Sequence, residues 1–220
     1  MVQDWSPLAI SLWVSTLAGI IALILGIGLA WLLVRKEFRG KGIIEGLTLL
    51  SLVLPPTVLG YYLLLLLGQR GLGPLIEQIL GVRFVFAWPG AVVAASITAL
   101  PLVLQTVRIS FADINKEVED AAFVDGCTEW QLLWRVMLPI AWRGVVAGGL
   151  LGFLRALGEF GATLMVAGNI PGKTQTLAMA IYNAVQANNM AAANGFALIL
   201  IAIAFGMLAI TLWLNRRVLN

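Results

Sequence analysis

Stretches of apolar residues alternate with short charged segments along the chain. Five of these stretches have about the 20 residues that a helix, rising 1.5 Å per residue, needs to cross a bilayer. The predicted spans are residues 8–34, 46–68, 88–107, 140–166 and 196–214. We therefore expect an all-α integral membrane protein with five transmembrane helices, in which residues 1–220 form a single transmembrane domain.

The uncharged stretch from Thr174 to Asn215 is long enough for two spans, which would give six in total. Its first half is rich in amide side chains, and unpaired polar groups are costly in lipid. A sixth span would also place Arg216 and Arg217 on the outer side. We therefore predict one span here, preceded by an external or re-entrant helix.

Basic residues lie mainly between the spans and report the orientation of the chain. If residues 35–41 are cytoplasmic, alternation of the spans makes 108–139 a cytoplasmic loop. Ten of the fourteen Lys and Arg residues are then inside: Arg35, Lys36, Arg39, Lys41, Arg108, Lys116, Arg135, Arg143, Arg216 and Arg217. The positive-inside rule thus predicts an outer N-terminus at Met1 and a cytoplasmic C-terminus at Asn220.

The composition agrees with a membrane location. Charged residues make up 11% of the chain, against roughly 25% in soluble domains. The net charge of +3 comes from bases that flank the spans, so it indicates topology rather than nucleic-acid binding. One cysteine, Cys127, excludes an intrachain disulfide, and the absence of histidine argues against a metal site. The start of the chain carries Asp4 and no base, which is unlike a cleavable signal peptide.

Small residues recur at every fourth position in the first and fourth predicted spans. Such stripes let helix backbones approach closely in lipid, where association depends on packing. Two four-member stripes predict a tightly packed bundle: Ala18, Ala22, Gly26, Ala30 and Gly144, Gly148, Gly152, Ala156.

Prolines interrupt the second and third spans, at Pro55, Pro56 and Pro101. Proline removes a backbone donor, which membrane proteins tolerate where neighbours or a water-filled cavity satisfy the freed carbonyls. The break at Pro55, Pro56 and Thr57 is therefore either a pore-lining element or a structural kink.

Apart from Arg143 at the cytoplasmic start of the fourth span, Arg155 and Glu159 are the only charged residues predicted within a span. Their spacing of four would place them on one face of a helix, and each alone would cost about 2.5–3.5 kcal/mol at the centre of the bilayer. Pairing inside the bundle removes most of that cost. A structural ion pair is the leading interpretation, and a direct role on the path of an anion is the alternative.

Residues 117–139 form a charged segment between the third and fourth spans. Glu117, Glu119 and Asp120 fit the first turn of a helix, where the dipole favours anions. Gly126 permits a positive φ for a turn, and Pro139 fits the start of the next helix. These features predict a short helix, a turn and a return to the membrane. The alternative is a solvated loop that only joins two spans.

The spacing within this segment is specific. Asp120, Ala121 and Ala122 are followed by three residues, Gly126, nine residues, and then 136–139, Val-Met-Leu-Pro. This resembles the cytoplasmic loop of the membrane subunits of bacterial ATP-binding-cassette (ABC) importers, with Asp120 in place of the usual Glu and Val136 in place of Ile. The resemblance implies a type I importer-like permease fold and an ATPase-coupling set: Glu117, Glu119, Asp120, Ala121, Ala122, Gly126, Leu138 and Pro139.

A second segment narrows the resemblance. Residues 158–163, Gly-Glu-Phe-Gly-Ala-Thr, and 168–174 are similar to importers of tetrahedral oxyanions, particularly molybdate permeases. Sulfate, thiosulfate and tungstate permeases are the alternatives. The resemblance and the span interruptions together suggest a set of pore or gate residues: Pro55, Pro56, Thr57, Arg155, Glu159, Phe160 and Gly161.

The resemblance implies a transport subunit of the bacterial inner membrane rather than an enzyme. Its expected partners are a second copy of the chain, two ABC ATPase subunits that hold ATP and Mg²⁺, an external oxyanion-binding protein and membrane lipid, with no nucleic acid and no cofactor or metal on this chain. A stand-alone secondary carrier is less favoured, because Glu159 is the only embedded acid and no repeat relates the halves. Residues 172–174, Gly-Lys-Thr, are not a phosphate-binding loop, since Ala167 replaces its first glycine.

Overall fold

The computed structural model describes residues 5–216, and side chains through residue 212. Within this range the chain forms helices joined by turns and loops, with no strand, so the predicted all-α class is confirmed. Met1 and Asn220 lie outside the described residues, and the sides of the membrane assigned to the two termini stay predictions.

Three helices form the core of the bundle: α1 (Ser6–Arg35), α5 (Trp88–Ala112) and α9 (Trp142–Leu157). The two predicted stripes of small residues lie where these helices meet. A Cβ atom on Gly26 of α1 would lie 2.7 Å from Cγ1 of Val103 on α5, and one on Gly152 of α9 would lie 2.5 Å from Cγ2 of the same valine. These glycines therefore allow α1 and α9 to pack closely on α5.

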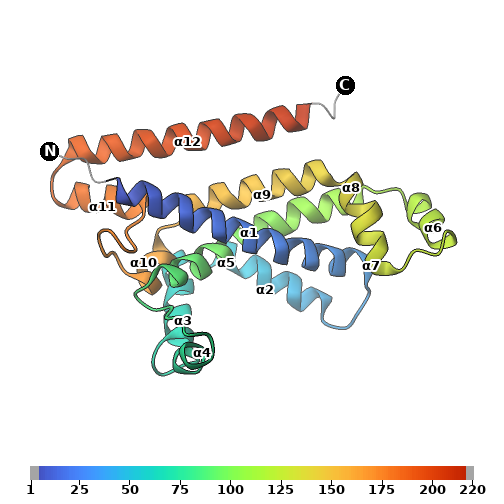
Figure 1. The fold of residues 1–220 in the computed structure, drawn as a ribbon, viewed down its shortest axis with the longest axis horizontal. Helices are drawn as coiled ribbons and strands as arrows, with labels where there is room; N and C mark the ends of the chain where they lie inside the picture. The colour runs from blue at the N-terminus through green and yellow to red at the C-terminus, as the bar shows by residue number, and fades with distance from the viewer. Residues whose placement is uncertain (1–4, 217–220) are drawn as a thin grey trace.

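Three helices are long and apolar enough to cross a membrane: α1, α5 and α12 (Met190–Arg216), the last counted over Met190–Leu212. The number rises to five if each of two sharply bent helix pairs is one span, so the structure has three to five candidate spans among the described residues. Figure 1 shows α12 along one side of the bundle, where it packs on α9 and α11 (Leu177–Gln186).

The second predicted span is broken where proline predicted an interruption. Helix α2 (Lys41–Val53) and α3 (Pro56–Leu67) meet at 117°. Leu54, which precedes Pro55, is extended with ψ of 140°, because the proline ring disfavours the helical conformation of the residue before it. A short helix, α4 (Gly73–Leu80), follows α3.

The fourth predicted span is not one helix. Helix α9 ends at Leu157, and α10 (Gly161–Ala167) begins after a break at 158–160. The expectation that Arg155 and Glu159 share a helix face is therefore wrong, because Glu159 lies beyond the end of α9. Its carboxylate instead accepts a hydrogen bond from the backbone N–H of Ala162 in the first turn of α10, at 2.9 Å.

Candidate functional site

The charged segment after α5 begins with a short helix, as predicted. Helix α6 (Lys116–Val124) is capped by Asn115, whose Oδ1 accepts a hydrogen bond from the backbone N–H of Glu117 at 3.0 Å. Glu117 and Glu119 occupy its first turn, where the positive end of the helix dipole stabilises carboxylates. Helix α6 lies at one end of the bundle, and α10 and α11 lie at the other (Figure 1).

Gly126 ends α6 in the left-handed conformation, with φ of 82°. The N–H of Gly126 donates to the carbonyl of Phe123, and the N–H of Cys127 donates to the carbonyl of Ala122, both at 3.0 Å. This pair of bonds is the Schellman motif, which needs a left-handed residue at the glycine position. No atom lies within 4 Å of a Cβ placed on Gly126, so backbone conformation alone calls for glycine here.

A second helical segment follows the turn and was missed by sequence reasoning. It comprises α7 (Glu129–Leu132), one π-helical stretch, η1 (Leu133–Met137), and α8 (Leu138–Ile140), and it meets α9 at 81°. Thr128 and Gln131 form a capping box at its start, a signal that was available in the sequence. Pro139 therefore does not begin the following span; it lies in the last turn of this segment.

The predicted coupling residues divide between two faces of the loop. Glu117, Asp120, Ala121, Gly126 and Pro139 are exposed. By contrast, Glu119 is buried, and Ala122 and Leu138 pack against the hydrophobic core.

The exposed face of α6 also carries an apolar residue that the sequence reasoning did not single out. Val124 is 87% exposed at the end of the helix. Large apolar side chains on a loop outside the bundle are typical of a surface that another protein covers.

The inner face of the loop is tied to the end of α1. Arg35 forms an ion pair with Glu119 and also lies over the ring of Phe123, with Cζ 5.3 Å from its centroid. The Lys36 ammonium lies 2.6 Å from Oε1 of Glu129. This hydrogen bond holds the pKa of the Glu129 carboxyl below its usual value, with added attraction from the charges of Lys36 and Arg35.

The predicted pore or gate residues lie at two helix breaks, of which only the one at Pro55 and Pro56 was predicted, and the two breaks lie side by side. Helix α10 packs against α3, and a Cβ on Gly161 would lie 3.0 Å from Cβ of Pro56 and 3.3 Å from Cγ2 of Thr57. One turn further along α3, a Cβ on Gly60 would lie 2.7 Å from Cα of Ala162. The structure therefore brings together residues of the second and fourth spans that the sequence separates by about a hundred positions.

The charged pair lies at the same break. Nη1 of Arg155 donates to Oε2 of Glu159 at 2.8 Å, and Glu159 is 2% exposed. Both carboxylate oxygens of Glu159 have partners, because Oε1 accepts from the N–H of Ala162. The ring of Phe160 lies 5.3 Å from that of Tyr182 on α11. Glu159 thus joins the end of α9 to the start of α10.

The loop between α10 and α11 is held by its own polar side chains. Asn169 donates to Asn183 at 2.8 Å and accepts from Gln175 at 3.0 Å. The buried hydroxyl of Thr174 donates to the carbonyl of Gly168 and accepts from the N–H of Ile170. Two amide side chains of the uncharged stretch, Gln175 and Asn183, are therefore used in holding this loop.

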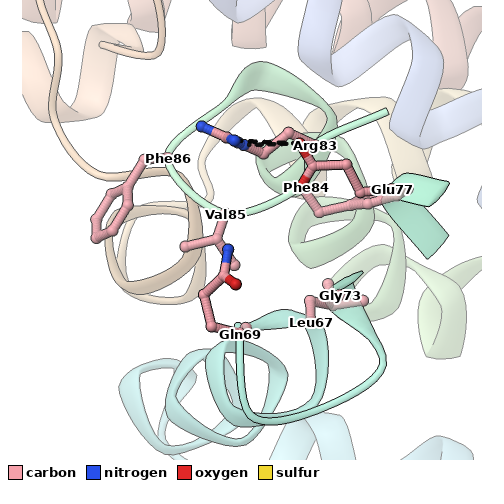
Figure 2. Close-up of a pocket in the computed structure, with 9 residues that line it drawn as sticks. Leu67, Gln69, Gly73, Glu77, Arg83, Phe84, Val85 and Phe86 are labelled. Atoms are coloured by element: carbon pink, nitrogen blue, oxygen red, sulfur yellow. Dashed lines mark hydrogen bonds and ion pairs between the residues drawn. The ribbon is translucent and has the colours of Figure 1, made fainter. Parts of the chain in front are cut away.

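A pocket of about 230 Å³ lies between the end of α3, α4 and residues 83–86. Arg83 reaches Glu77 across its rim at 3.1 Å, and Gln69 lies on the other side (Figure 2). Both members of this ion pair are solvated, so it contributes little to stability. Among the described residues, no group of three or more Cys, Asp or Glu residues is arranged to hold a metal ion.

Residues 22–220 match the family described as binding-protein-dependent transport system inner membrane component. The molybdenum transport system permease protein ModB of Escherichia coli (strain K12) is 39% identical over 215 residues, covering 97% of this chain and 94% of that protein. ModB of Haemophilus influenzae is 40% identical over 218 residues, covering 98% and 95%. The sulfate transport system permease protein CysW of Synechococcus elongatus is 38% identical over 160 residues, covering 72% and 56%.

Among solved structures, a chain of a bacterial alginate ABC transporter has a TM-score of 0.75 at 16% identity, covering 99% of this chain and 80% of that chain. That transporter was solved in complex with an alginate pentasaccharide-bound periplasmic protein. At this identity the similarity shows the fold alone. Because the family match and the curated relatives both extend over most of the sequence, this chain belongs to the binding-protein-dependent inner membrane components, the permease subunits of ABC importers.

Proposed function

We propose that this protein is the permease subunit of an ATP-driven importer that moves molybdate, a tetrahedral oxyanion, into the bacterial cytoplasm. The observation that carries the substrate assignment is the identity of 39–40% to two ModB proteins over nearly the whole of each chain. The sulfate permease CysW aligns over only 56% of its length, which favours molybdate over sulfate.

The working assembly consists of two copies of this chain, two ABC ATPase subunits and an external oxyanion-binding protein. The exposed face of α6, with Glu117, Asp120 and Val124, is the surface that enters a groove of the ATPase. ATP and Mg²⁺ are held by the ATPase. The basic residues Arg35 and Lys36, which pair with the loop that carries α6, support a cytoplasmic position for this surface.

Transport follows by alternating access. ATP draws the two ATPase subunits together, the coupling loops move with them, and the spans turn so that the path opens outward. Release of the hydrolysis products returns the path to the inward-open state. ATP must favour the outward state by about 5.5 kcal/mol to reverse a population ratio of 1:99.

The broken helices are the proposed gate. Pro56, Thr57, Phe160 and Gly161 lie at the starts of α3 and α10, where the chain changes direction in each span. The Arg155–Glu159 pair holds the α9–α10 break in shape, because Glu159 bonds to both helices. This favours the structural interpretation of the pair over direct contact with the anion.

The function is tested in vesicles reconstituted with the permease, its ATPase and the binding protein. Uptake of labelled molybdate that requires both ATP and the binding protein is the expected result. Uptake of labelled sulfate under the same conditions, without uptake of molybdate, would move the protein to the sulfate permeases. Uptake that is independent of ATP and driven by an ion gradient would make it a secondary carrier.

A further inference from the structure

The cytoplasmic end of α1 contacts both helical segments of the coupling loop. Arg35, the last residue of α1, pairs with Glu119 of α6, and Lys36 pairs with Glu129 of α7. The last residue of α1 and the residue that follows it therefore hold the two helices of the loop. A displacement of the loop acts on this end of α1.

The two ion pairs are not equivalent. The side chains of Lys36 and Glu129 are 43% and 46% exposed, and a solvated pair of this kind contributes little. Glu119 is only 6% exposed, and a carboxylate without a partner at such a site is strongly unfavourable. Arg35 is therefore the residue that keeps α6 attached to α1 while the loop moves.

The opposite end of α1 is attached to the loop that precedes α11. The backbone N–H of Leu177 donates to Oγ of Ser11 at 2.7 Å, and both residues are buried. The Ser15 hydroxyl donates to the carbonyl of Ser11 at 2.6 Å. Because Leu177 is the first residue of α11, this contact joins α1 to the start of α11, directly after the loop at 168–176.

Helix α1 connects these two attachments without a break. It runs for 30 residues, with its one proline in the first turn at Pro7. At 1.5 Å per residue, Ser11 and Arg35 are about 36 Å apart along the helix axis. Between Ser11 and Arg35, α1 is one uninterrupted helix without a proline or a π-helical turn, which are two of the causes of sharp bends.

We propose that α1 carries the movement of the coupling loop to the outer loop at 168–176, with Arg35 as the positioning residue at one end and Ser11 as the anchor at the other. This role rests on the importer function proposed above. The second and fourth spans are broken and can change shape at their breaks, whereas α1 moves as a rigid body between its contacts at Ser11 and Arg35. Movement of the coupling loop is thereby coupled to rearrangement of the loop at 168–176.

The test uses the complete complex of permease, ATPase and binding protein in vesicles, with molybdate uptake and ATP hydrolysis measured on the same sample. In Arg35→Gln, the ATPase remains bound, but molybdate taken up per ATP falls at least about fivefold. Lys41→Gln is the matched control, since it removes one positive charge from the same loop and breaks only an exposed pair with Glu37. In Lys41→Gln, the amount of molybdate taken up per ATP stays at the wild-type value.

Two further variants keep the proposal testable if Arg35→Gln does not assemble. Exchange of the charges, Arg35→Glu with Glu119→Arg, restores at least half of the wild-type ratio. Ser11→Ala, at the other end of α1, lowers the ratio without touching the coupling loop. A wild-type ratio in Arg35→Gln and Ser11→Ala, or a parallel loss of uptake and hydrolysis in both, overturns the proposal. If the wild-type complex itself shows no molybdate uptake dependent on the binding protein, it is the proposed function that fails.

Discussion

The carboxylate of Glu159 binds the guanidinium of Arg155 at 2.8 Å across the end of α9, and its second oxygen caps α10. The pair therefore stabilises a bend rather than one face of a straight helix. Removal of either charge leaves the other in an apolar bundle, where a lost partner costs about 3–5 kcal/mol.

Arg155→Ala is expected to lower the expression and thermal stability of the protein, because Glu159 is then buried with one bond fewer. The double variant Arg155→Ala with Glu159→Ala should recover much of the loss in stability, since neither charge remains. Unfolding temperatures in detergent provide the measurement. Normal stability of Arg155→Ala together with lost molybdate uptake would contradict a structural pair and support contact with the anion.

Gly60→Ala is expected to destabilise the protein by about 1–3 kcal/mol, because the added methyl would overlap the α10 backbone at Ala162. Gly46→Ala in α2 is the matched control. No atom lies within 4 Å of a Cβ at Gly46, so alanine should stabilise its helix by about 0.5–1 kcal/mol. A similar gain of stability in both variants would show that helix propensity, and not the contact between α3 and α10, sets the effect.

Gly126→Val should weaken association with the ATPase, because a β-branched residue is strained at φ of 82° and α6 is then misdirected. Gly126→Asn is the control, since asparagine tolerates the left-handed conformation. Co-purification of the ATPase measures the effect, and the permease should still insert and dimerise. In Asp120→Ala, the free energy of binding to the ATPase should weaken by only about 1–3 kcal/mol, because one contact is removed. If Gly126→Val binds the ATPase as well as the wild-type permease does, residues 117–139 are an ordinary connecting loop.

Cysteine labelling in a Cys127→Ser background tests the topology. Asp120 is exposed on α6, and a cysteine there should react only from the cytoplasm. Gln186, at the exposed end of α11, should react only from the outer side when replaced by cysteine. Reaction of position 186 only from the cytoplasmic side would reverse the predicted topology of the second half.

Several features of the fold and the site follow from local sequence. Apolar stretches predict helices wherever a segment must satisfy its own backbone hydrogen bonds in lipid. Pro55 and Pro56 predict the break between α2 and α3, because proline acts through its own ring and missing N–H. Gly126 predicts the left-handed turn after α6 for an equally local reason.

Other features depend on partners that are distant in the sequence. Glu119 belongs to the predicted ATPase-coupling set, yet it is buried against Arg35, which lies 84 residues earlier. The spacing of Arg155 and Glu159 fits a continuous helix equally well, and the sequence holds no proline to mark the break at 158–160. There the packing of α10 on α3, with Ala162 against Gly60, accompanies the change of direction. Sequence alone thus determined which segments are helical and where proline and glycine turn the chain, because those effects act within a few residues. Only the tertiary structure decided that Glu119 pairs with Arg35 and that the fourth span is broken at 158–160, because both involve contacts between helices that the chain order does not specify.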